Sequence, residues 1–167
     1  MTKLFRSDNL TLGTDSPAAR TALENTLRQY RCFVRDLMTV ISTHWPTLAR
    51  CEGNEAVSVI ESLIHPTTKR PNVRYRYFPS RYYKFPSYYR RVAIMDAMGQ
   101  VRSFMTRYGK WLDGDRKHPH AKPPTLTCST QTFPSLYQGQ CIKYSEKGDT
   151  AAIKVYFNND WLWMTFR

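Results

Sequence analysis

Basic and aromatic side chains are interleaved from Lys69 to Arg91, a stretch that we call the basic-aromatic tract. Its cations are Lys69, Arg70, Arg74, Arg76, Arg81, Lys84, Arg90 and Arg91, and its rings are Tyr75, Tyr77, Phe78, Tyr82, Tyr83, Phe85, Tyr88 and Tyr89. Guanidinium and ammonium groups bind phosphate oxygens, and flat rings stack on exposed base faces. The tract therefore predicts contact with a single strand or a splayed-out loop of nucleic acid.

Tyrosine-rich segments have a second use, because a buried Tyr ring can keep its hydroxyl in water at a protein interface. We expect some rings of the tract to lie in the core. The alternative hypothesis is a basic structural or adaptor protein that docks another protein through the tract. However, the sequence has no Asp or Glu from Ser62 to Met95. Packing alone does not explain so many cations without a counter-charge, which favours nucleic acid.

The charge of the whole chain is consistent with that interpretation. Its 167 residues contain 25 Lys and Arg against 13 Asp and Glu, a formal net charge of +12. Such a charge favours a polyanionic partner and salt-dependent binding. A hydrophobic content of 41% predicts a folded chain.

The remaining composition predicts neither a metal site nor a membrane anchor. The four cysteines have no C-x-x-C spacing, so we expect reduced thiols rather than a zinc or redox motif. The first ten residues are charged, unlike a signal peptide, and the apolar runs are too short to span a membrane. We expect a soluble, cytoplasmic protein with no membrane partner and no cofactor of its own.

Two helices are predicted before the tract, after a short strand over Thr2–Leu12. The first spans Pro17–Trp45, because Ser16 can cap it and apolar residues then recur at steps of four and three. A row of arginines follows one side of this helix within ~80° of arc, and these are Arg20, Arg28, Arg31 and Arg35. The second helix is predicted over Ala49–Ile64.

Prolines at positions 79 and 86 predict that the tract is not regular helix before Ser87. A third helix then follows to Leu112, with Arg102 beside its apolar stripe and Gly114 as its stop. Asp113–Pro124 is a polar linker. Thr125–Thr127 is expected to be extended, and antiparallel strands are expected over Cys141–Tyr144, Ala151–Phe157 and Trp161–Phe166.

Four segments of the sequence carry a family resemblance. They are FPSYYRRVAIMDAMGQVRSFMTRYGKW, KPPTL, FPSLYQG and AIKVYFNNDWLWMTF, and they fall between Phe85 and Phe166. This part of the chain resembles the N-terminal half of TnpB proteins, the transposon-encoded, RNA-guided DNA endonucleases related to type V CRISPR effectors. The first 84 residues are similar to that family in organisation only.

The resemblance implies an α+β fold, with a helical recognition-like bundle inserted into an antiparallel β-barrel or sheet (wedge-like, OB-like). Residues 1–15 would form the first strand of the barrel, residues 16–118 the helical domain with the tract, and residues 119–167 the remaining strands. The implied partners are guide RNA and target DNA. The family's RuvC-like domain, with its divalent metal, would be a further C-terminal half or a separate chain.

Cleavage is not expected from this chain, although it resembles an enzyme family. Two-metal cleavage of a phosphodiester needs clustered carboxylates, whereas the acids here are scattered over helices, linker and turns. We therefore expect no catalytic residue and no metal site. The predicted nucleic-acid-binding residues are Arg20, Arg28, Arg31, Arg35, Arg74, Arg76, Tyr77, Arg81, Tyr82, Tyr83, Lys84, Arg90, Arg91 and Arg102.

Overall fold

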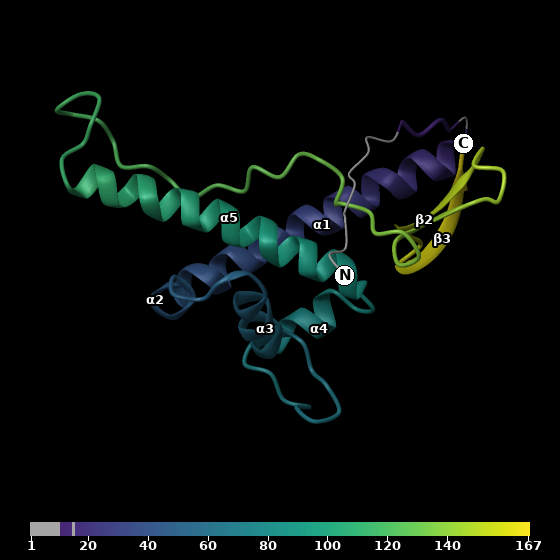
Figure 1. Cartoon of the computed structure of the whole chain (residues 1–167), viewed down its shortest axis with the longest axis horizontal. Coiled ribbons are helices and arrows are strands. Elements are labelled where there is room, and N and C mark those ends of the chain that lie inside the picture. The colour runs from purple at the N-terminus through teal and green to yellow at the C-terminus, as the bar shows by residue number, and fades with distance from the viewer. Residues whose placement is uncertain (1–10, 15) are drawn as a thin grey trace, which may run out of the picture.

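The protein is an α+β chain of five helices and one antiparallel sheet in the part that the structure, a computed structural model, describes: residues 11–14 and 16–167 (Figure 1). The elements are α1 (Pro17–Thr43), α2 (Trp45–Leu48), α3 (Gly53–Ile64), α4 (Tyr77–Arg81), α5 (Ser87–Leu112), β1 (Ile142–Tyr144), β2 (Ala151–Phe157) and β3 (Asp160–Phe166). The strands form an open sheet in the order β1-β2-β3. No helix among the described residues has the length and apolar character needed to cross a membrane.

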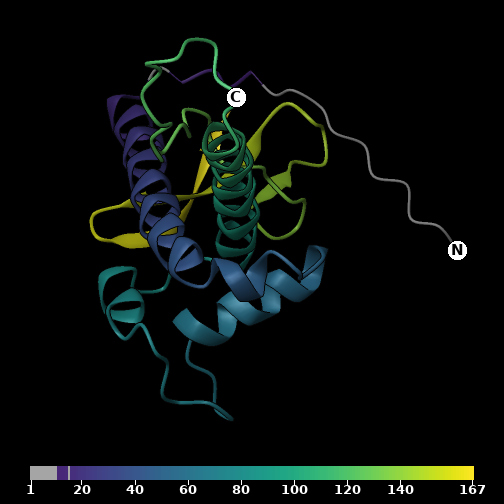
Figure 2. The ribbon, with the colours of Figure 1, turned by 90° about the vertical axis from the view of Figure 1, so that its left-hand side faces the viewer.

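Helix α1 is the element that joins the helical part to the sheet. Its start follows the expected chemistry, since the Ser16 hydroxyl accepts a hydrogen bond from the Ala19 N–H and Pro17 occupies the first turn. The helix packs against both α5 and β2, and the sheet lies at its N-terminal end (Figures 1 and 2). The helical part and the sheet therefore both pack against α1.

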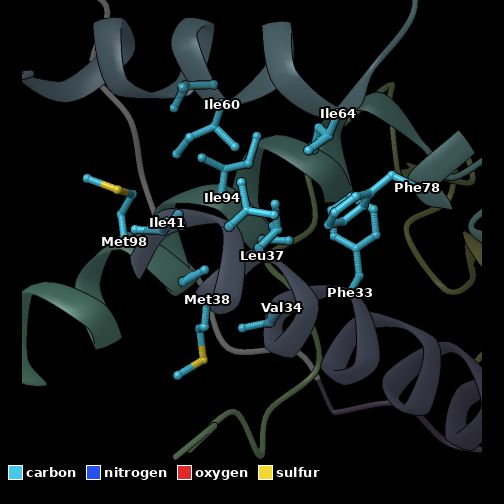
Figure 3. Close-up of a cluster of buried hydrophobic side chains, with 14 of the residues drawn as sticks. Phe33, Val34, Leu37, Met38, Ile41, Ile60, Ile64, Phe78, Ile94 and Met98 are labelled. Atoms are coloured by element: carbon cyan, nitrogen blue, oxygen red, sulfur yellow. The ribbon is translucent and has the colours of Figure 1, made fainter. Parts of the chain in front are cut away.

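The larger hydrophobic core lies where α1, α3 and α5 meet. Leu37 and Ile41 of α1, Ile60 of α3 and Ile94 of α5 are all fully buried there (Figure 3). A smaller core fills the space between the first turns of α1 and the sheet. It consists of Ala19, Ala22, Ile142, Ile153, Val155 and Phe166.

The β2–β3 hairpin was predicted from its alternating pattern, and the structure confirms it. Asn158 and Asn159 have φ angles of 50° and 61°, as a two-residue hairpin turn requires. Because β1 is short, it leaves the Tyr156 N–H without a strand partner. The buried Thr26 hydroxyl of α1 accepts that N–H at 2.7 Å and so fixes α1 to the sheet.

Several predicted boundaries move. The first helix ends at Thr43 instead of Trp45, because α2 begins there with Pro46 in its first turn. The second begins at Gly53 and not at Ala49. Pro79 does not keep the tract free of helix, since it lies inside the one-turn α4. Residues 125–127 lie in no strand.

The first predicted strand, Thr2–Leu12, lies outside the described residues except for its last two. Gly13, which follows that segment, is hydrogen-bonded to the last residue of the sequence, Arg167. Gly13 and Arg167 exchange two backbone hydrogen bonds, of 2.6 and 3.3 Å, directly after β3. The division into domains at residues 15 and 118 remains a prediction.

Candidate nucleic-acid interface

The structure divides the tract into two parts with different surroundings. Residues 67–76, which we call the basic loop, leave the end of α3 and return to it. The Tyr75 N–H donates to the Leu63 carbonyl at 3.0 Å, and Val73 is buried beneath the loop. Residues 77–91, which we call the packed half, contain α4 and the start of α5.

The cations of the basic loop are exposed and free of acids. They are Lys69, Arg70, Arg74 and Arg76. None of them forms an ion pair with any other residue in the described part of the chain. Two backbone hydrogen bonds between Thr67 and Arg70 hold the outer turn, so these charges are presented on an ordered loop.

Aromatic rings mark the return of the basic loop to the helices. The Tyr75 hydroxyl lies 2.9 Å from His44 Nε2, which anchors the ring to the end of α1, and the Arg74 guanidinium lies 6.0 Å from the centre of that ring. The adjacent Tyr77 ring is 42% exposed. Cations and an accessible ring thus lie side by side.

The packed half has counter-charges that the sequence did not reveal. Acids from distant segments reach its cations: Arg81 pairs with Asp36 at 3.3 Å, Lys84 with Asp160 at 3.5 Å, and Arg90 and Arg91 with Glu61 at 3.0 and 3.8 Å. The premise of a tract without counter-charge therefore holds only for the basic loop. Since Arg81, Lys84 and Arg91 are more than half exposed, their pairs are weak and phosphate could replace the acid.

Most rings of the packed half face inward, around Phe33 of α1. The centre of the Phe33 ring lies 4.2 Å from that of Phe85 and 4.7 Å from that of Tyr82. It lies 5.3 Å from the centre of the Phe78 ring, which is beside it in Figure 3. Tyr89 is fully buried and donates its hydroxyl to the Lys154 carbonyl at 2.8 Å. These rings connect the tract to α1 and the sheet.

The adjacent tyrosines at 82 and 83 have opposite environments. Tyr82 is buried and donates to Asp36 Oδ2 at 2.6 Å. Burial, and then this hydrogen bond, raise the pKa of Tyr82. Tyr83 is 67% exposed. The structure therefore separates a packing ring from an accessible one, which the sequence left open.

The predicted arginine row on α1 is solvent-exposed along its whole length. Arg20, Arg28, Arg31 and Arg35 are all exposed, and Arg20 and Arg35 are separated by ~22 Å of helix. Arg35 Nε lies 3.8 Å from Asp36, the acid that also pairs with Arg81. The row therefore meets the tract at Asp36. Arg102 is exposed on α5 and has no acid partner among the described residues.

The sheet carries a basic-aromatic group that sequence reasoning missed. The ammonium groups of Lys143 and Lys154 lie 4.5 and 5.6 Å from the centre of the Trp163 ring. Lys154 faces Trp163 across the β2–β3 ladder. The signal was present in the predicted hairpin, because pairing about the turn places these two residues opposite each other on one face.

No group of three or more His, Cys, Asp and Glu side chains that could hold a metal ion occurs among the described residues. The acids Asp36, Glu61 and Asp160 face arginines and lysines. The surface therefore offers cations and rings, which bind anions and flat groups by contact.

These features define an α+β chain with a cationic, partly aromatic surface. Residues 6–157 match the Aq_aa04 family, and the chain belongs to that family. No curated protein and no solved structure matches the chain.

Proposed function

We propose that this chain is a nucleic-acid-binding module that holds RNA through the basic loop, with help from the arginine row of α1. The observation that carries the proposal is the charge of the loop: four exposed cations without an acid partner among the described residues. Keeping like charges together is unfavourable without counter-ions. When a polyanion binds, counter-ions are released into solution, and this release is the main source of binding free energy to a phosphate backbone.

The finer proposal is that the chain is the guide-RNA and target-DNA recognition half of a TnpB-like nuclease. It is supported by the resemblance between Phe85 and Phe166. The order of elements is consistent with it, since helices separate Gly13 from the C-terminal sheet, and Gly13 is hydrogen-bonded to Arg167 directly after β3. A wedge-like barrel would need more strands than the three that are described. In this proposal the chain binds RNA and DNA, and a RuvC-like partner cuts.

Salt dependence tests the binding function. A fluorescently labelled form of the RNA that copurifies with the chain would be titrated at several KCl concentrations, with anisotropy as the signal. Replacing Lys69, Arg70, Arg74 and Arg76 by Ala should weaken binding. The plot of log K against log salt should become less steep. The magnitude of its negative slope should decrease by ~0.7 to 0.9 for each phosphate that the variant no longer neutralises, or by about 3 if all four cations contribute.

A matched variant controls for net charge. Arg107, Lys110, Lys117 and Lys122 are also exposed and unpaired with acids among the described residues, but they lie toward the C-terminal end of α5 and in the linker. Their replacement by Ala removes the same charge and should leave the slope nearly unchanged. Equal slopes in the two variants would mean that only net charge matters. Absence of any copurifying or added RNA on the wild-type chain would favour the adaptor hypothesis.

A further inference from the structure

Next to the exposed Tyr83 ring lies a hollow of about 190 Å³ with largely apolar walls. Its walls come from α1, from the end of α3 and the residues after it, and from α4 and the residues after it, and they include Phe33, Pro66, Phe78, Pro79, Tyr82 and Tyr83. Phe33, Ile64 and Phe78 line the hollow and also belong to the core cluster, in which they lie near one another (Figure 3). Lys84 and Arg90 also line it, so cations stand beside the rings.

A second, more polar hollow of about 430 Å³ lies on the other side of Lys84. It is lined by Ser87, Gln140, Lys154, Asp160 and Trp161 in addition to Lys84. Lys84 is thus common to an aromatic hollow and a polar one. The polar hollow contains two ammonium groups and one carboxylate, a net positive charge that suits an anion.

The backbone between the two hollows is strained. Lys84 has a φ of 54°, in the left-handed region that a lysine adopts at a cost. This conformation places the Lys84 ammonium 5.3 Å from the centre of the Tyr83 ring while the ring remains 67% exposed. Strain of this kind is typical of ligand-binding positions, and here it presents a ring and a cation together.

We propose that this site binds one unpaired nucleotide of an RNA strand. The base would enter the aromatic hollow and stack on Tyr83, and its phosphate would lie at the polar hollow near Lys84 and Lys154. Stacking needs an exposed base face, so the occupant must be a single-stranded or bulged nucleotide rather than one within a duplex. The inference rests on the proposed function and adds to it a preference for unpaired nucleotides over duplex RNA.

The charges at the site favour a nucleotide over an apolar peptide. Lys84 and Lys154 line the polar hollow with the acid Asp160, whereas the charge of Arg90 in the aromatic hollow is already paired with Glu61 at 3.0 Å. A peptide would have to bring carboxylates at the right spacing. A nucleotide has an aromatic base and an anionic phosphate joined by one sugar, which matches two hollows that share one lysine.

The test compares two RNA hairpins of the same length. One has a single bulged 2-aminopurine, and the other has that position paired. The wild-type chain should bind the bulged hairpin about 5- to 150-fold more tightly, the range that corresponds to one stacked base. Binding should also change the fluorescence of the bulged base, because stacking on Tyr83 alters its environment.

Tyr83→Ala should remove that preference, so that the variant binds the two hairpins with equal affinity. Its fold should be intact, since the side chain is largely exposed. The matched control is Tyr144→Ala, which removes a ring that is 46% exposed on β1. This control should keep the preference.

The possible results separate this inference from the proposed function. If both hairpins bind equally well, the nucleotide site is wrong and the binding function stands. If neither hairpin binds, both are wrong. A preference for the bulge that survives Tyr83→Ala, or that Tyr144→Ala removes equally, also overturns the site.

Discussion

The basic loop and the packed half are neighbours in one tract with similar composition, yet they differ in almost every contact. The loop keeps its four cations exposed and without acids among the described residues, whereas the packed half meets acids from α1, α3 and β3. The loop buries one side chain, Val73. The packed half places four rings in the core. Composition alone therefore does not separate a binding surface from a structural one.

The difference teaches that distant segments decide the role of each residue. Arg90 is 11% exposed at its side chain and lies against Glu61, so its charge supports the junction of α3 and α5. Arg74 has the same chemistry but no acid beside it among the described residues. An arginine held in a partly buried pair is costly to leave unpaired, while an exposed arginine is available to a phosphate.

The comparison predicts its largest effect at Tyr89, the most buried ring of the packed half. Tyr89→Ala should lower the free energy of unfolding by about 3–5 kcal/mol, because the truncation leaves a cavity and an unsatisfied Lys154 carbonyl. Urea unfolding measures this loss.

The control for Tyr89 is Tyr77→Ala, which truncates a ring that is 42% exposed. It should change stability by about 0.5 kcal/mol or less. Equal losses in the two variants would contradict the assignment of Tyr89 to the core and of Tyr77 to the exposed surface.

Hydrophobic periodicity was sufficient to locate most elements. The apolar stripe of α1 and the Ser16-Pro17 start give that helix within two residues, and alternation gives all three strands within one residue. These signals work because each element buries one face, which fixes its period. The ends moved where α2 and α4 form, since single turns are too short for a period.

The sequence also contained a pattern that distinguishes the buried rings of the tract from the exposed ones. The prolines at positions 79 and 86 argued against reading it as a helical period. Phe78, Tyr82, Phe85 and Tyr89 recur at steps of four, three and four, and all four are buried. The same period predicted burial in the other helices. The acids that meet the tract could not be predicted, because Asp36 and Asp160 lie far away in the sequence and approach only in the folded chain.

A second prediction uses pH to separate buried from exposed rings. Burial and the hydrogen bond to Asp36 raise the pKa of Tyr82, and burial raises the pKa of Tyr89. An unfolded tyrosine has a pKa near 10. Each raised pKa means that the folded state holds its proton more tightly, so this stabilisation is complete below pH 10 and is lost as pH rises further. The free energy of unfolding should fall above pH 10 by about 1.4 kcal/mol per pH unit for each such tyrosine.

Tyr82→Phe checks the assignment of this effect. At pH 7 it should be about 1 kcal/mol less stable than wild type, because the hydrogen bond to Asp36 is lost. Above pH 10 its stability should fall less steeply, and the two curves should converge. Urea unfolding between pH 8 and 11.5 measures both slopes. Curves that stay parallel would mean that Tyr82 does not hold its proton more tightly in the folded state.

The smallest effect is expected at Lys84, where the packed half carries a strained backbone and an exposed cation. Lys84→Gly should be about 1 kcal/mol more stable than Lys84→Ala, because glycine adopts a φ of 54° without the penalty that a Cβ imposes. Both variants lose the ammonium and its exposed pair with Asp160, so their difference isolates the backbone. Thermal unfolding gives the stabilities, and the bulged hairpin gives the affinities.

Both variants should bind that RNA more weakly than wild type and to the same extent. A glycine variant that is no more stable than the alanine variant would mean that the left-handed conformation costs nothing here. If only the alanine variant lost affinity, the backbone and not the ammonium would be what the RNA requires.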